Sequence, residues 1–191
     1  MLQTLFGIQV ARLDGLLTPQ EVAAANCAAI ATDLALNPFR VPYSRPDKRS
    51  LDVLCPAEFE VVFAKVKAAT ESAYDVRVTS LIGRESVFLN GQHLPVHVEG
   101  DAHLSAVLWL DWSAKPNSNE KDFNGVFCMQ NPSGVIGFKN LPWETPRSQN
   151  FEPCSGSLLI HPSYVPHYVF PYHGIRPGVE VHFEILVEKK Q

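Results

Sequence analysis

Residues 91–110 of the chain read GQHLPVHVEGDAHLSAVLWL, and this stretch decides the fold class. It holds two runs of β-prone residues, LPVHVE at 94–99 and the run that begins HLSAVLWL at 103, with a short turn between them. Short runs of this kind recur from residue 76 onward, about eight to nine in all, and turns separate them. This spacing is typical of an antiparallel sandwich or barrel, so we predict one for residues 76–191.

The chain before residue 76 has a different residue pattern, which predicts helices. Residues 3–13 read as an initial strand. Thr18 and Glu21 have the spacing of a capping box, which predicts a helix from Pro19 to Leu36. A second helix is expected over residues 56–73, where apolar residues recur at three- and four-residue steps and form one apolar face.

Together these elements predict a single domain over residues 1–191, mainly β with N-terminal helices. Residues 1–75 supply the strand and the helical support, and residues 76–191 form the β core. Long loops are expected at 38–55, 113–124 and 139–153, and we expect them to determine the substrate.

The composition excludes several classes of protein. Hydrophobic residues make up 46% of the chain and charged residues 19%, which excludes wholesale disorder. The net charge of −4 argues against a sequence-independent binder of nucleic acid or of anionic membranes. We therefore expect a small-molecule or protein substrate. A homodimer is a further expectation, because an edge strand or the helical face offers an interface.

The cysteines and the N-terminal residues indicate the cellular compartment of the protein. No pair among Cys27, Cys55, Cys128 and Cys154 has CxxC spacing, which argues against a zinc ribbon or a thioredoxin-type motif. The first residues lack the basic and apolar regions of a signal peptide. No apolar run approaches the roughly 20 residues that span a bilayer. We expect a cytoplasmic protein with reduced thiols.

All seven histidines lie after residue 92, and two of them suggest a metal site. His97 and Glu99 are two residues apart, so they share one face of a strand. An imidazole and a carboxylate are two of the three ligands in the 2-His-1-carboxylate site of non-haem Fe(II) oxygenases. His167, which follows a proline-containing turn, is the strongest candidate for the third ligand. The remaining histidines are expected to be ordinary: His93 and His173 in loops, His161 partly buried, and His182 facing solvent or a partner.

Several motifs resemble the 2-oxoglutarate- and Fe(II)-dependent dioxygenases common in phages and marine bacteria. Gly91 is followed after five residues by His97-Val-Glu99, and then by Ser105-Ala-Val-Leu-Trp-Leu110. The later segments that match the family pattern are Phe127–Pro132, Pro153–Pro171 with His167, and Gly178–Ile185. The similarity covers nearly the whole chain.

This resemblance implies a double-stranded β-helix, or jelly roll, flanked by two helices. It also implies an oxygenase that uses Fe(II) and 2-oxoglutarate to hydroxylate a substrate, with His97, Glu99 and His167 as its catalytic metal ligands. The resemblance assigns the far carboxylate of 2-oxoglutarate to an arginine, and Arg176 is the candidate here. Two positions depart from the family pattern. Gly178 stands where a gap-free alignment places that arginine, and Glu180 would repel the carboxylate if it faced the pocket.

Three alternatives remain open. In a cupin-type metal site, His103 would join His97 and His167, and no 2-oxoglutarate would be needed. A degenerate, non-catalytic jelly roll would keep the fold as a binding module. Asp101 would replace Glu99 as the carboxylate ligand only if the chain bends at Gly100.

Overall fold

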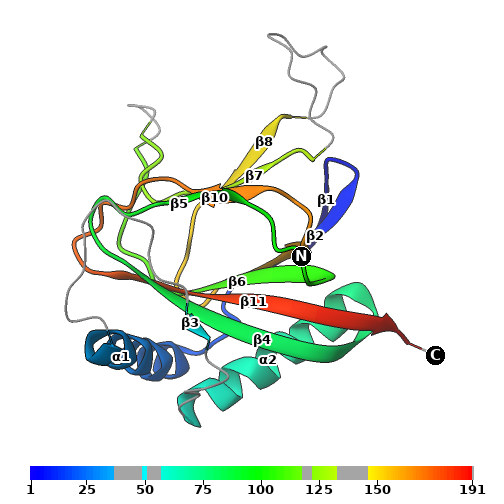
Figure 1. Ribbon diagram of the computed structural model, residues 1–191, viewed down its shortest axis with the longest axis horizontal. Coiled ribbons are helices and arrows are strands. Elements are labelled where there is room, and N and C mark those ends of the chain that lie inside the picture. The colour runs from blue at the N-terminus through cyan, green and yellow to red at the C-terminus, as the bar shows by residue number, and fades with distance from the viewer. Residues whose placement is uncertain (37–48, 51–56, 118–121, 133–145, 191) are drawn as a thin grey trace.

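The computed structural model describes residues 1–36, 49–50, 57–117, 122–132 and 146–190. Within these ranges the chain forms two antiparallel sheets that face each other, and both helices lie on one side (Figure 1). The predicted jelly roll with two flanking helices is therefore confirmed. The division of the chain at residue 75 stays a prediction.

The larger sheet has seven strands, in the spatial order β1 (Leu2–Leu5), β2 (Ile8–Leu13), β9 (Leu158–Pro162), β6 (Leu104–Asp111), β11 (Gly178–Lys189), β4 (Val76–Phe88) and β3 (Arg49–Ser50). The smaller sheet has four strands, in the order β5 (Leu94–His97), β10 (His167–Val169), β7 (Phe127–Gln130) and β8 (Ser148–Phe151). Strand β11 pairs with β4 on one side and with β6 on the other, so it lies inside the larger sheet.

Both predicted helices are present, as α1 (Pro19–Leu36) and α2 (Ala57–Tyr74). The capping box at the start of α1 also forms: the Thr18 amide donates to Glu21 Oε2 at 2.7 Å, and the Glu21 amide donates to Thr18 Oγ1 at 3.3 Å. No helix in the described ranges combines the length and the apolar character that crossing a membrane requires.

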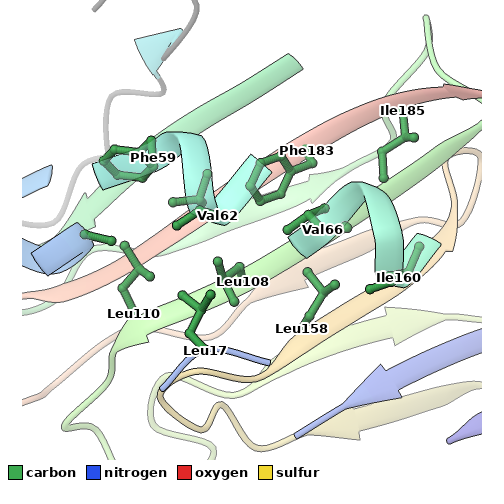
Figure 2. Packing of buried hydrophobic residues seen from close by; sticks show 14 of the residues in the cluster. Leu17, Phe59, Val62, Val66, Leu108, Leu110, Leu158, Ile160, Phe183 and Ile185 are labelled. Carbon is green, nitrogen blue, oxygen red and sulfur yellow. The ribbon is translucent and has the colours of Figure 1, made fainter. Parts of the chain in front are cut away.

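The helices cover the outer face of the larger sheet. The apolar face predicted for α2 presents Phe59, Val62 and Val66, all of which are fully buried (Figure 2). They pack in one cluster with side chains of β6, β9 and β11, among them Leu108, Leu158 and Phe183. Burying each such side chain contributes about 1.5–3 kcal/mol to folding.

Two local predictions differ from the structure. The initial strand predicted over residues 3–13 is a hairpin of β1 and β2, because Phe6 and Gly7 both take positive φ angles, 54° and 79°, as in a two-residue turn of the I′ type. The loop predicted at 139–153 contains β8, whose polar sequence SQNF gives no strand signal. Most of the loop predicted at 38–55 lies outside the described residues.

Alternation along β11 divides its side chains between two environments. Val181, Phe183 and Ile185 point to the helices and join the cluster under α2. Glu180 and His182 point the other way, into the space between the two sheets. Over residues 178–183 both faces of β11 are therefore buried, and Glu180 and His182 lie on the inner face.

Candidate metal centre

The structure brings His97, Glu99 and His167 together. His97 ends β5 and His167 begins β10, and the two are paired residues in the smaller sheet. Their ring centroids lie 4.3 Å apart, and His97 Nε2 lies 3.4 Å from Glu99 Oε1. One ligand atom from each of the three side chains lies within 4.8 Å of the others. Two imidazoles and one carboxylate thus converge on a single point.

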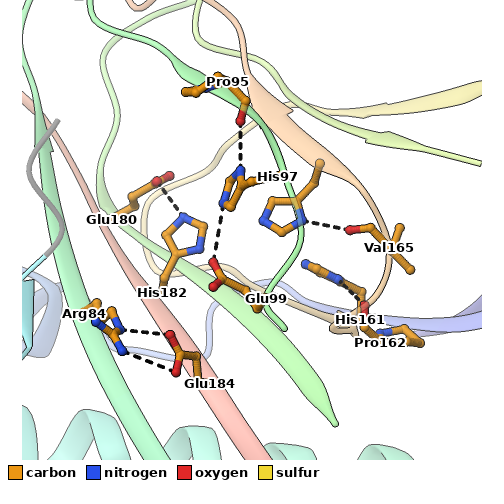
Figure 3. Close-up of polar contacts among 11 residues, drawn as sticks. Arg84, Pro95, His97, Glu99, His161, Pro162, Val165, Glu180, His182 and Glu184 are labelled. Atoms are coloured by element: carbon orange, nitrogen blue, oxygen red, sulfur yellow. Dashed lines mark hydrogen bonds and ion pairs between the residues drawn. The ribbon is translucent and has the colours of Figure 1, made fainter. Parts of the chain in front are cut away.

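Backbone carbonyls fix the orientation of both rings. His97 Nδ1 lies 2.8 Å from the Pro95 carbonyl (Figure 3), and His167 Nδ1 lies 3.0 Å from the Val165 carbonyl. Because a carbonyl only accepts, each Nδ1 carries the proton and each Nε2 presents a lone pair. Metal-binding histidines are held in this way in most proteins.

The atom that fits a metal most clearly is Nε2 of His167. It is buried, and it has no hydrogen-bond partner among the described residues. Burial and the neighbouring histidines keep the pKa of His167 well below its usual value, so the ring is neutral. A buried, neutral and unpartnered nitrogen that faces a carboxylate is the donor that a divalent metal requires.

Two further histidines adjoin the cluster, and the sequence predictions for them were wrong. His161 was expected to be partly buried, but it is only 1% exposed, and its ring centroid lies 4.8 Å from that of His167. His182 was expected to face solvent or a partner. It is 3% exposed, and its Nε2 lies 2.8 Å from Glu180 Oε1 (Figure 3).

The reason for the second error is the position of β11. The alternation of His182 with Val181 and Phe183 correctly separates two faces of the strand. The smaller sheet covers the face that carries His182, so that face is an interior wall and not a surface. The alternation within one strand carries no signal of that second sheet.

Arg176 does not lie among these side chains. It precedes β11, its side chain is 62% exposed, and its guanidinium forms an ion pair with Asp111 at 3.0 Å. Tyr172 and Ser113 hold its backbone: Tyr172 Oη donates to the Arg176 carbonyl at 2.5 Å, and the Arg176 amide donates to Ser113 Oγ at 3.1 Å. Arg84, drawn in Figure 3, pairs with Glu184.

The alternative ligands lie elsewhere. His103 Nδ1 accepts a hydrogen bond from the Val187 amide at 3.0 Å, and the His103 side chain lines a surface groove with Tyr74. Asp101 is exposed. In the part of the chain that the structure describes, His97, Glu99 and His167 form the one group of three such side chains close enough to share a metal ion. His93 and His173 lie in loops, as predicted, and both are exposed.

The fold has many counterparts among solved structures. No protein-family profile matches the chain, and none of the curated proteins does. A prolyl-4-hydroxylase from Pseudomonas putida is 16% identical, with a TM-score of 0.64 over 95% of this chain and 88% of that one. The non-heme alpha ketoglutarate dependent carbocyclase SnoK from nogalamycin biosynthesis is 12% identical, with a TM-score of 0.67 over 94% and 79%.

A third similar structure is HygX from Streptomyces hygroscopicus, whose crystal holds nickel and 2-oxoglutarate. It is 12% identical, with a TM-score of 0.62 over 91% of this chain and 80% of that one. At these identities the similarity shows that the chain shares their fold. What the chain does has to be argued from its own residues.

Proposed function

We propose that this chain is an Fe(II)- and 2-oxoglutarate-dependent oxygenase in which His97, Glu99 and His167 are the metal ligands. The observation that carries this proposal is the convergence of these three side chains between the sheets, with one ligand atom from each within 4.8 Å of the others. Structures of the same fold support it, since one is described as alpha ketoglutarate dependent and another holds nickel and 2-oxoglutarate.

Three protein ligands leave three positions of a six-coordinate metal open. When bound, Fe(II) and 2-oxoglutarate supply the oxidising chemistry: O2 and 2-oxoglutarate are consumed, succinate and CO2 are released, and the substrate is oxidised, usually by hydroxylation. The Pro95 and Val165 carbonyls orient the two imidazole rings that would hold the metal. Phe127 stacks on His167 at a centroid distance of 5.3 Å and shields that ligand from water.

The interior also fits a ligand rich in hydrogen-bond acceptors. Ser86 Oγ, Ser105 Oγ and Trp109 Nε1 are buried and have no hydrogen-bond partner among the described residues. All three lie on strands of the larger sheet, on the face turned toward the smaller one. Native proteins rarely leave buried donors unpaired, so these atoms favour a bound ligand such as 2-oxoglutarate.

We further propose a cytoplasmic location and a small-molecule or protein substrate. Cys27, Cys128 and Cys154 carry free thiols, as expected in a reducing compartment. The net charge of −4 favours a substrate other than nucleic acid. Both kinds of ligand occur among the similar structures, because one is a prolyl hydroxylase in complex with a peptide fragment and another is an epimerase in complex with nogalamycin RO. A homodimer stays a prediction.

The test uses purified protein with Fe(II), ascorbate and 2-oxoglutarate, and it measures succinate. We expect slow succinate formation even without the true substrate, and Glu99→Ala should abolish it. Asp101→Ala is the matched control, since it removes an exposed carboxylate two residues away and should leave turnover unchanged. If the iron-loaded protein neither binds nor consumes 2-oxoglutarate, the oxygenase assignment is wrong and a non-catalytic binding module is favoured.

A further inference from the structure

The ring of His161 is held in the same way as the rings of the two histidine ligands. Its Nδ1 lies 2.9 Å from the Pro162 carbonyl (Figure 3), just as the Nδ1 atoms of His97 and His167 lie against carbonyls of their own. Because a carbonyl only accepts, Nδ1 carries the proton. Burial lowers the pKa of His161 to about 4, so the ring is neutral at pH 7. Its Nε2 therefore presents a lone pair.

This ring adjoins the metal centre without belonging to the ligand group. Its centroid is 4.8 Å from that of His167, and the two rings meet edge-on. Glu99 raises the pKa of His161 and His97 lowers it, so both ligands lie within electrostatic reach. His161 is nevertheless not a member of the group whose ligand atoms lie within 4.8 Å of one another. Its Nε2 is thus too far from at least one of those atoms to share the metal directly, and a molecule bound to the metal can bridge the gap.

A serine hydroxyl lies next to His161 on the same inner face of the larger sheet. Ser105 on β6 is the register partner of His161 on β9, and the Cβ atoms of register partners are about 4.5–5.5 Å apart. Each of the two residues is 1% exposed, and Ser105 Oγ has no hydrogen-bond partner among the described residues. Native proteins often satisfy buried polar groups of this kind with an ordered water.

The charges beside these two residues favour a hydrogen-bond donor over an anion. Glu184 on β11 follows next across the sheet, because it pairs in register with Ser105. Its carboxylate forms an ion pair with Arg84 at 2.9 Å, so that guanidinium already has an anionic partner. The lone pair of His161 and the carboxylate of Glu184 both attract an O–H hydrogen and repel an anion. A divalent metal polarises the water that it binds, which makes this water a good donor.

We propose that His161 and Ser105 are positioning residues that together hold a water molecule on an open position of the metal, next to His167. This inference rests on the proposed function. A metal-bound water has two hydrogens, and it donates one to His161 Nε2 and the other to Ser105 Oγ. The serine keeps its own hydroxyl hydrogen for a second ligand. A water held at two points leaves the metal less readily, so this position stays filled until a ligand replaces the water.

The test is calorimetric titration of the metal-free chain with Fe(II), without oxygen and without 2-oxoglutarate. His161→Leu and Ser105→Ala should each weaken Fe(II) binding about two- to tenfold, the value of one hydrogen bond. The double variant should lose less than the product of the two single losses, because a water freed from one residue is held less firmly by the other. His161→Gln keeps an acceptor in its side-chain carbonyl and should bind Fe(II) more tightly than His161→Leu. His103→Leu, at an exposed histidine, is the matched control and should leave the affinity unchanged.

Ser105→Ala guards against misfolding, because it removes an unpaired hydroxyl and should leave the melting temperature of the metal-free chain equal or higher. The proposal is overturned if His161→Leu loses more than about hundredfold in affinity, as expected for His167→Ala, since His161 would then be a metal ligand. It is also overturned if neither single variant loses affinity, or if the two losses multiply in the double variant. These results leave the proposed function standing, whereas a wild-type chain that binds no Fe(II) defeats both.

Discussion

The two faces of the seven-stranded sheet bury side chains of different chemistry. The face under the helices is mostly apolar, with aliphatic and aromatic side chains from five strands and both helices, and Glu85 is a buried charged residue there. The inner face also buries aromatic rings, but among them lie Glu180, His161, His182 and three unpaired donors. Figure 2 shows the first environment and Figure 3 the second. Buried polar groups cost stability, and those of the inner face gather beside His97 and His167, which indicates that this face is kept for binding.

The alternation of side chains along each strand separates the two environments. On β11, Phe183 packs edge-on against Phe63 of α2 at 5.4 Å, while its neighbour His182 lies beside the metal-ligand candidates. A change on one face should therefore alter stability, and a change on the other should alter binding. The predictions below test that separation.

The largest expected effect is on the helical side. Phe183→Ala removes a fully buried ring and should lower the free energy of unfolding by about 3–5 kcal/mol, as measured by urea denaturation. Leu186→Ala, at a half-exposed position of the same strand, should change it by less than about 1 kcal/mol. Fe(II) affinity of the folded protein should stay within twofold in both variants. A large loss of affinity in Phe183→Ala would show that the two faces are not separate.

A smaller effect is expected on the inner face, as a dependence of stability on pH. Burial lowers the pKa of His161 from 6.5 to about 4 in the folded chain. Between these values the unfolded chain binds more protons, so stability is complete above about pH 6.5 and falls as the pH approaches 4. The loss attributable to His161 is up to about 3 kcal/mol.

Urea denaturation of the metal-free protein at pH 7 and at pH 5 measures this loss of stability. The wild-type chain should lose more stability on acidification than His161→Gln, which lacks the titrating ring. An equal loss in the two proteins would mean that His161 is already solvated in the folded chain, contrary to its 1% exposure.

The sequence predicted the parts of this molecule that depend on local signals. The capping box of α1 needs only the spacing of Thr18 and Glu21, and the apolar face of α2 needs only a helical period. The shared orientation of His97 and Glu99 follows from a two-residue repeat. We predicted His167 as a ligand from its position after a turn and from the family resemblance. The pairing of β5 with β10 places it opposite His97.

The rest depends on contacts between distant segments. The interior position of His182 requires a second sheet over β11, which the alternation within one strand cannot reveal. The position of Arg176 depends on Asp111, which comes close because β6 and β11 pair there, at Asp111 and Val179.

The central claim is that the inner face holds a metal through His97, Glu99 and His167. Calorimetric titration of the metal-free chain with Fe(II), in the absence of oxygen, tests it most directly. We expect one Fe(II) per chain, a loss of affinity of more than about hundredfold in His167→Ala, and no loss in His103→Ala, whose ring accepts a hydrogen bond from the β11 backbone. A wild-type chain that binds no Fe(II), or a loss that is equal in the two variants, would contradict it.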